Sequence, residues 1–151
     1  MPGTAPGMSA PFQLDPRLEA DSLPVAELSL CSLRLMDDQR FPWLLLVPRR
    51  AGLRELFELS AFDQAELLIE LNHAARALSA VAKPHKLNLG ALGNIVEQLH
   101  LHLIARQPGD AAWPGPVWGS GARQPYAPAD ARALIARLIT ALDATRACAD
   151  D

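Results

Sequence analysis

The sequence is poor in cysteine and has no excess of basic residues. Cys31 and Cys148 are its only two cysteines, and they have neither the density of a disulfide framework nor the spacing of a thiolate metal site. This cysteine usage fits a reducing compartment, so we expect a cytoplasmic protein. The 14 lysines and arginines are outnumbered by 17 aspartates and glutamates, for a formal charge of -3. Proteins that bind a phosphate backbone usually carry a basic face, so we expect no nucleic-acid partner.

Long apolar runs are also absent. The segment "WLLLVP", residues 43–48, is far shorter than the roughly 18 apolar residues of a membrane span, so we expect no membrane partner. Residues 1–20 are rich in Pro, Gly and Ala and carry neither the basic nor the apolar segment of a signal peptide. We expect a flexible arm there. Residues 21–151 are expected to form one domain, because a chain of 151 residues of which 50% are apolar can bury one core.

Apolar patterns predict two helices and four strands. Ser60 can cap a long helix that ends at Pro84, and residues 129–149 form a second amphipathic helix near the C-terminus. Strands typically show rough alternation of apolar and polar residues, or a short apolar run between turn residues. We expect strands over residues 27–36, 42–48, 85–94 and 95–106.

The segment "VEQLHLHLIARQ", residues 96–107, places polar side chains at alternate positions. Successive side chains of a strand point to opposite faces. Gln98, His100 and His102 would therefore share one face, with leucines on the other. Three hypotheses explain the two histidines: a metal site, an inert polar pair, or catalysis by an imidazole.

The residues next to the two histidines favour catalysis over a metal site or an inert polar pair. Zinc requires three or four protein ligands, and no further His, Cys or carboxylate has a spacing that completes the set, so we expect no metal ion. A neutral imidazole held in one tautomer can instead attack phosphorus. Gly93 and Asn94 come just before the histidines and can supply donors to the phosphate oxygens.

Residues 98–104, "QLHLHLI", resemble the motif of the histidine triad family, His-φ-His-φ-His-φ-φ with φ apolar. Two of the three histidines and all the apolar positions match. The similarity extends to "MDDQRFPWLLLVPRR", "KLNLGALGN" and "ARQPGDAAWPGPVWG", and it covers about residues 29–119. It implies an α+β fold, with an antiparallel sheet of about five strands, one long helix and a C-terminal helix, in a two-fold homodimer. The fifth strand would lie in the N-terminal arm or between Glu55 and Leu59.

The resemblance also implies residue roles. His100, at the middle position of the triad, would be the nucleophile, and His102 would contact phosphate. Gln98 stands in place of the first histidine, so a hydrogen-bonding group remains but a titratable one does not. Ile95 occupies a position where other members often carry Ser or Thr. The expected substrate-binding residues are Asn88, Gly93, Asn94 and Asp37, with Asp38 as the alternative to Asp37 for the ribose hydroxyls.

The implied activity is hydrolysis or nucleotidyl transfer at the α-phosphate of a small nucleotide, without a cofactor. A nucleotidyl-histidine intermediate would form on the way. Dinucleoside polyphosphates and nucleoside phosphoramidates are both substrates in the family. The alternative is a nucleotide-binding or scaffold protein whose catalysis is weakened by Gln98 and Ile95.

Two tryptophans lie in the Pro- and Gly-rich segment that follows the histidines. Each indole either packs on the protein or stacks on a nucleobase. Prolines keep the cost of ordering this loop low, so we expect Trp113 or Trp118 to cover the nucleotide and count Trp113 among the substrate-binding residues. Trp43, inside a predicted strand, is expected to respond little to ligand.

Overall fold

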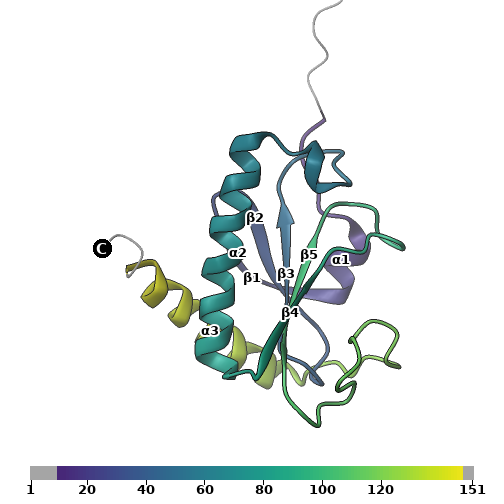
Figure 1. The fold of residues 1–151 in the computed structure, drawn as a ribbon, viewed down its shortest axis with the longest axis vertical. Coiled ribbons are helices and arrows are strands. Elements are labelled where there is room, and N and C mark those ends of the chain that lie inside the picture. Colours follow the sequence, from purple (N-terminus) through teal and green to yellow (C-terminus); the bar gives the residue numbers. More distant parts are fainter. Residues whose placement is uncertain (1–9, 148–151) are drawn as a thin grey trace, which may run out of the picture.

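Five strands form one antiparallel sheet in the order β1-β2-β3-β5-β4. The computed structural model describes residues 10–147. With the helices around it, this sheet confirms the expected α+β architecture (Figure 1). The strands are β1 (Ser22–Glu27), β2 (Cys31–Met36), β3 (Trp43–Pro48), β4 (Lys86–Gly90) and β5 (Leu101–Arg106).

Strand β1 is the fifth strand that the sequence left unplaced. It follows the N-terminal arm and pairs with β2, with Ser22 opposite Met36. Residues 55–59, the other candidate, contain a short 3-10 helix, η1 (Leu56–Glu58). The prediction of one strand over residues 27–36 was wrong before Cys31, where β2 begins. The amide of Leu28 bonds the carbonyl of Cys31 and closes a hairpin turn there. Alternation of Leu with polar residues continues through this turn, so the pattern did not reveal it.

Helix α1 (Pro16–Asp21) lies within the arm that was expected to be flexible. The carboxylate of Asp15 accepts a bond from the amide of Arg17, and Pro16 occupies the first turn, where its missing amide costs nothing. Residues 1–9 of the expected arm lie outside the described residues.

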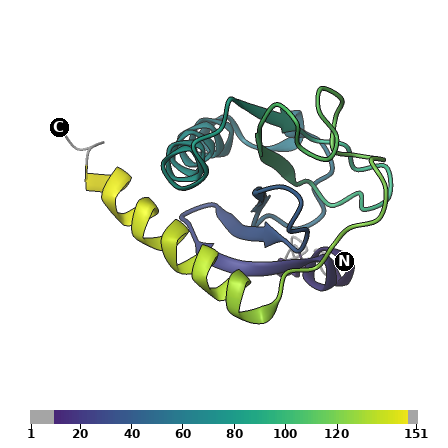
Figure 2. The ribbon, with the colours of Figure 1, turned by 90° about the horizontal axis from the view of Figure 1, so that it is seen from below.

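The long helices α2 (Ala61–Ala82) and α3 (Pro128–Ala147) lie on one side of the sheet, and α1 lies on the other (Figure 2). Ser60 caps α2 as predicted, since its side chain accepts a bond from the amide of Asp63. Leucines of α2 and α3 form the main core together with Leu99, Leu101 and Leu103. Within residues 10–147 no helix is both long and apolar enough to cross a membrane.

The other face of the sheet carries the two histidines above a second apolar cluster. Strand β5 begins at Leu101 and not at residue 95 as expected, because residues 91–100 form a loop. The alternation nevertheless holds, with His100 and His102 opposite the leucines of the main core. The second cluster joins β3 and β5 to α1 and to the segment after β5 through Trp43, Ile104, Leu18 and Val117.

Candidate active site

A pocket of about 520 Å³ opens on the histidine face of the sheet. His100, His102 and Trp43 lie on its sheet side. Leu18 of α1 and Trp118 of the segment after β5 contribute to its walls. One site therefore combines polar groups from the sheet with apolar side chains from elements far apart in the sequence.

His100 is oriented by its own neighbour. Its ring is buried, and its Nδ1 lies 2.6 Å from the backbone carbonyl oxygen of Gln98. A carbonyl oxygen only accepts hydrogen bonds, so in the neutral ring Nδ1 carries the proton and Nε2 carries the lone pair. A neutral imidazole in this tautomer is a nucleophile.

His102 has the opposite tautomer. The indole Nε1 of Trp43 donates to its Nδ1 over 3.0 Å. Because an indole nitrogen only donates, the proton of His102 lies on Nε2, where it can be donated to a phosphate oxygen. Burial and the neighbouring His100 lower the pKa of His102 to about 3, so its ring is neutral near pH 7. Trp43 therefore belongs to the site, whereas its expected weak response to ligand stays a prediction.

The glycine-rich loop before β5 also borders the pocket. Gly93 and Asn94 line it together with His100. Gly93 has a positive φ of 73°, a conformation that favours glycine over residues with a side chain. Four residues expected at one site, Gly93, Asn94, His100 and His102, are thus brought together.

Asn88 and Trp113 do not line this pocket; both contact Arg106 instead. The guanidinium of Arg106 is buried; it donates to Asn88 Oδ1 over 2.7 Å and pairs with Asp110, also over 2.7 Å. The indole of Trp113 lies 5.8 Å from that guanidinium and meets the ring of His85 edge-on. The bond from Arg106 lowers the pKa of Asp110 to about 2. These contacts hold the loop after β5 against the sheet.

Trp118 is the tryptophan that reaches the pocket. Its ring meets His102 edge-on, with 5.3 Å between the ring centroids. The ring packs on Gly90, where a Cβ would lie 2.8 Å from Cη2 of Trp118. Its indole Nε1 is buried and has no hydrogen-bond partner among the described residues.

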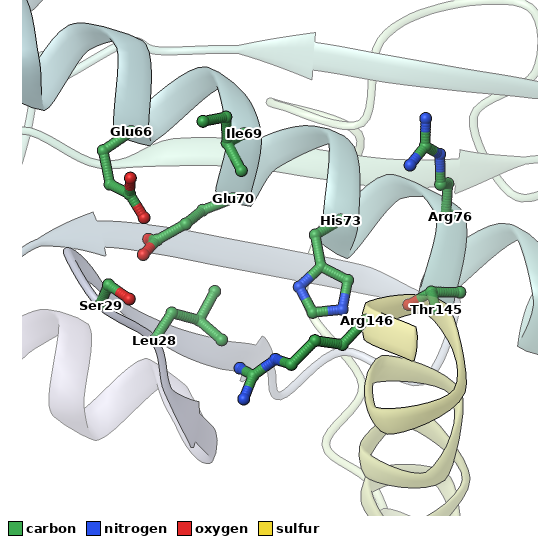
Figure 3. Close-up of a pocket in the computed structure, with 9 residues that line it drawn as sticks. All are labelled: Leu28, Ser29, Glu66, Ile69, Glu70, His73, Arg76, Thr145 and Arg146. Atoms are coloured by element: carbon green, nitrogen blue, oxygen red, sulfur yellow. The ribbon is translucent and has the colours of Figure 1, made fainter. Parts of the chain in front are cut away.

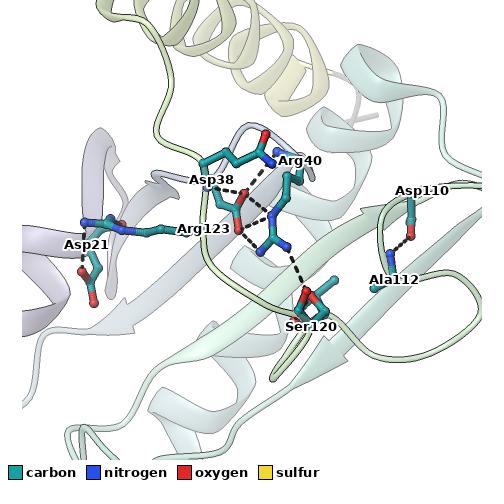
Figure 4. A network of polar contacts seen from close by, with 9 residues as sticks. Asp21, Asp38, Arg40, Asp110, Ala112, Ser120 and Arg123 are labelled. Atoms are coloured by element: carbon teal, nitrogen blue, oxygen red, sulfur yellow. Dashed lines mark hydrogen bonds and ion pairs between the residues drawn. The ribbon is translucent and has the colours of Figure 1, made fainter.

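Asp37 and Asp38 hold the segment between Trp118 and α3. Asp37 accepts a bond from the amide of Tyr126 over 2.9 Å and does not line the pocket. Asp38 lines the pocket, but its buried carboxylate pairs with Arg40 at 2.7 Å (Figure 4). Burial raises the pKa of Asp38, yet hydrogen bonds from Arg40 and from the amide of Gln124 keep it below the usual value. Arg40, which the sequence analysis missed, also donates to the carbonyl of Ser120.

Gln98 does not line the 520 Å³ pocket. Its backbone carbonyl holds His100, whereas its side-chain amide bonds Gln13 and Asp15 of the N-terminal segment. Of the expected catalytic group of three, the two histidines line this pocket and the glutamine does not.

A second pocket, of about 300 Å³, lies between α2, the end of α3 and the turn after β1 (Figure 3). The carboxylate of Glu70 accepts bonds from the amides of Leu30 and Cys31, and His73 Nε2 lies 2.7 Å from the carbonyl of Leu142. These polar groups fasten the hairpin and α3 to α2. Among the residues that the structure describes, no three His, Cys, Asp or Glu side chains are placed to hold a metal ion.

Known proteins are similar to this chain in sequence and fold. The HIT domain model matches residues 17–109. A histidine triad protein from Sinorhizobium meliloti is 51% identical, with 85% of this chain and 96% of that chain covered and a TM-score of 0.84. One from Marinobacter aquaeolei is 42% identical, with coverage of 90% and 99% and a TM-score of 0.87.

A curated relative, AP-4-A phosphorylase from Mycobacterium tuberculosis, is 35% identical over 83 residues. The match covers 51% of this chain and 42% of the relative, so the chain spans less than half the length of that protein. The match of the HIT domain model to well over half of the chain, together with the shared fold, shows that the chain belongs to the histidine triad (HIT) family.

Proposed function

We propose that the protein transfers or hydrolyses a nucleotidyl group through a covalent intermediate on His100. Nε2 attacks the α-phosphorus, an N–P bond forms, and the bond from phosphorus to the leaving group breaks. Water then attacks the same phosphorus and loses a proton, the N–P bond breaks, and a nucleoside monophosphate leaves. The observation that carries this proposal is the bond between His100 Nδ1 and the carbonyl of Gln98, which leaves Nε2 as the free nucleophile.

The remaining pocket residues fit the same reaction. His102 would donate its Nε2 proton to a non-bridging phosphate oxygen, and the backbone at Gly93 and Asn94 would add further donors. Leu18 and Trp118 offer an apolar surface for the nucleobase. Asn88, Asp37 and Trp113 would act indirectly, by holding loops that carry pocket residues.

We propose a dinucleoside polyphosphate as the substrate class. An amine leaving group must be protonated as it departs, whereas a polyphosphate departs as a stable anion. Gln98 cannot titrate, and burial lowers the pKa of His102 to about 3, so neither supplies an acid near pH 7. The printed name of the Mycobacterium tuberculosis relative, AP-4-A phosphorylase, supports the same class.

We also propose that the protein is a homodimer. Strand β4 is an edge of the sheet, and its Leu89 is exposed. Helix α2, which leads into β4, exposes Phe62, Leu68 and Ile69, with Ile69 63% exposed. An open strand edge and exposed apolar side chains on a helix each favour association with a second copy. Light scattering on the wild type and on Ile69→Glu tests this, with monomeric wild type as the contrary result.

Trapping the intermediate tests the catalytic proposal. Diadenosine tetraphosphate is added, the reaction is stopped in alkali because the N–P bond is labile in acid, and the intact mass is measured. The wild type should gain one adenylyl group, and so should the control His85→Ala, whose ring is outside the pocket. His100→Ala should gain none. AMP binding without adduct or turnover in the wild type would instead make the protein a nucleotide-binding or scaffold protein.

A further inference from the structure

The side chain of Gln98 bonds the N-terminal segment at two points. Its Nε2 donates to the carbonyl of Gln13 over 2.8 Å, and its Oε1 accepts from the amide of Asp15 over 2.9 Å. A primary amide presents its donor and its acceptor side by side. It can therefore bond a carbonyl and an amide two residues apart, as a neighbouring strand does.

A histidine at position 98 cannot make the same pair of bonds. The two nitrogens of a neutral imidazole point to opposite sides of the ring, so only one of them can face a single backbone segment. The glutamine that replaces the first histidine of the triad thus has a structural task for which its amide is suited.

A second contact fastens the same segment to the loop before β5. Arg17 Nη1 donates to the carbonyl of Ile95 over 2.9 Å, and its guanidinium also pairs with Asp15. Phe12 and Leu14 pack against the second apolar cluster. Residues 10–21, which we call the N-terminal strap, are thereby held across the histidine face of the sheet.

The strap contributes directly to the pocket. Leu18 is 4% exposed, and it lines the 520 Å³ pocket together with Asp21. Both residues lie in α1, whose cap, Asp15, is the residue that Gln98 holds. A loosened strap would remove one wall of the nucleotide site and leave the two histidines in place.

We propose that Gln98 is a positioning residue with two separate tasks. Its side chain fastens the N-terminal strap and so completes the wall that binds the nucleotide, while its backbone carbonyl orients His100. This inference rests on the proposed nucleotide site. Changes in the side chain should consequently weaken nucleotide binding more than they slow the chemical step.

Gln98→Met and Gln98→His test the side chain. In both variants the Asp15 amide should exchange hydrogen faster than in the wild type. Loss of two hydrogen bonds should raise the dissociation constant for AMP and the KM about tenfold, while kcat falls less than about threefold because the carbonyl that orients His100 remains. Gln64→Met is the matched control, because it removes a bond from a glutamine amide to the carbonyl of Leu59, outside the pocket.

Arg17→Ala provides a second variant that does not disturb the core, since the Arg17 side chain is largely exposed. It removes the bond from Arg17 to the carbonyl of Ile95. Like the Gln98 variants, it should exchange the Asp15 amide hydrogen faster and bind AMP more weakly. Unchanged Asp15 exchange in the Gln98 variants would overturn the fastening role. Faster exchange with unchanged AMP affinity would overturn the role of the strap in the pocket.

Neither the hydrogen exchange of the Asp15 amide nor the affinity for AMP requires turnover. A wild type that binds AMP but forms no adduct would contradict the catalytic proposal. It would not contradict the role of the strap in nucleotide binding. A wild type that binds no AMP would overturn both the proposed function and the pocket role of the strap, whereas Asp15 exchange would still report whether Gln98 holds the segment.

Discussion

The indole Nε1 of Trp43 donates a hydrogen bond to Nδ1 of His102, with 3.0 Å between the two nitrogens. The two residues lie on neighbouring strands, where Trp43 is opposite Ile104 and His102 is opposite Leu45. They are thus diagonal neighbours on one face of the sheet, a separation that an aromatic side chain can bridge. A residue on one strand thus fixes the tautomer of His102 on the neighbouring strand.

Trp43→Phe keeps an aromatic ring and removes the donor. The Nδ1 of His102 would lose its partner, which should lower the free energy of unfolding by about 1–3 kcal/mol. The Nε2–H tautomer would no longer be fixed, so kcat/KM should fall about tenfold or more. Nitrogen NMR shifts of the His102 ring report the tautomer, with Trp113→Phe as the control outside the pocket. An unchanged tautomer and rate would show that the bond has no role in the site.

Acid should destabilise the fold through His102. Burial, aided by His100, lowers its pKa from 6.5 to about 3. Between these two pH values the unfolded chain binds a proton that the folded protein does not, so the free energy of unfolding falls as the pH falls. The slope from one such group is at most about 1.4 kcal/mol per pH unit. Denaturant titrations between pH 7 and 4 should show a steeper decline in the wild type than in His102→Gln, and equal slopes would contradict the neutral, buried state.

The local parts of the fold and site could be predicted from sequence, and the long-range parts could not. Ser60 caps α2 by bonding the amide of a residue three positions away, and the two histidines alternate with leucines. Short sequence patterns reveal both. Gln98 bonds a residue 83 positions earlier, and Trp43 bonds one 59 positions later. Such partners depend on how the strands and the strap pack. The bond of Asp37 to the amide of Tyr126, 89 positions away, was missed for the same reason.

The catalytic rate should depend on the basicity of the leaving group. Gln98 cannot titrate and His102 is neutral near pH 7, so neither of these two residues can protonate a leaving group there. We expect kcat/KM to fall steeply along a series of AMP esters as the pKa of the leaving group rises, and to be far lower for an alkyl phosphoramidate than for diadenosine tetraphosphate. A flat series, or faster cleavage of the phosphoramidate, would show that another group supplies the proton.

Trp118 should report nucleotide binding, whereas Trp113 should not. Trp118 lines the pocket beside His102, and Trp113 packs on Arg106 and His85. AMP should therefore change the tryptophan fluorescence of the wild type and of Trp113→Phe, and much less that of Trp118→Phe. Trp118→Ala should raise KM more than it lowers kcat, since stacking on a base is worth about 1–3 kcal/mol. Gly90→Ala provides an independent check, because its Cβ would lie 2.8 Å from Trp118 Cη2 and would displace the indole. That variant should lose about 1–3 kcal/mol of stability together with AMP affinity. A fluorescence response that survives Trp118→Phe, with wild-type KM in Trp118→Ala, would mean that Trp118 only packs against the sheet.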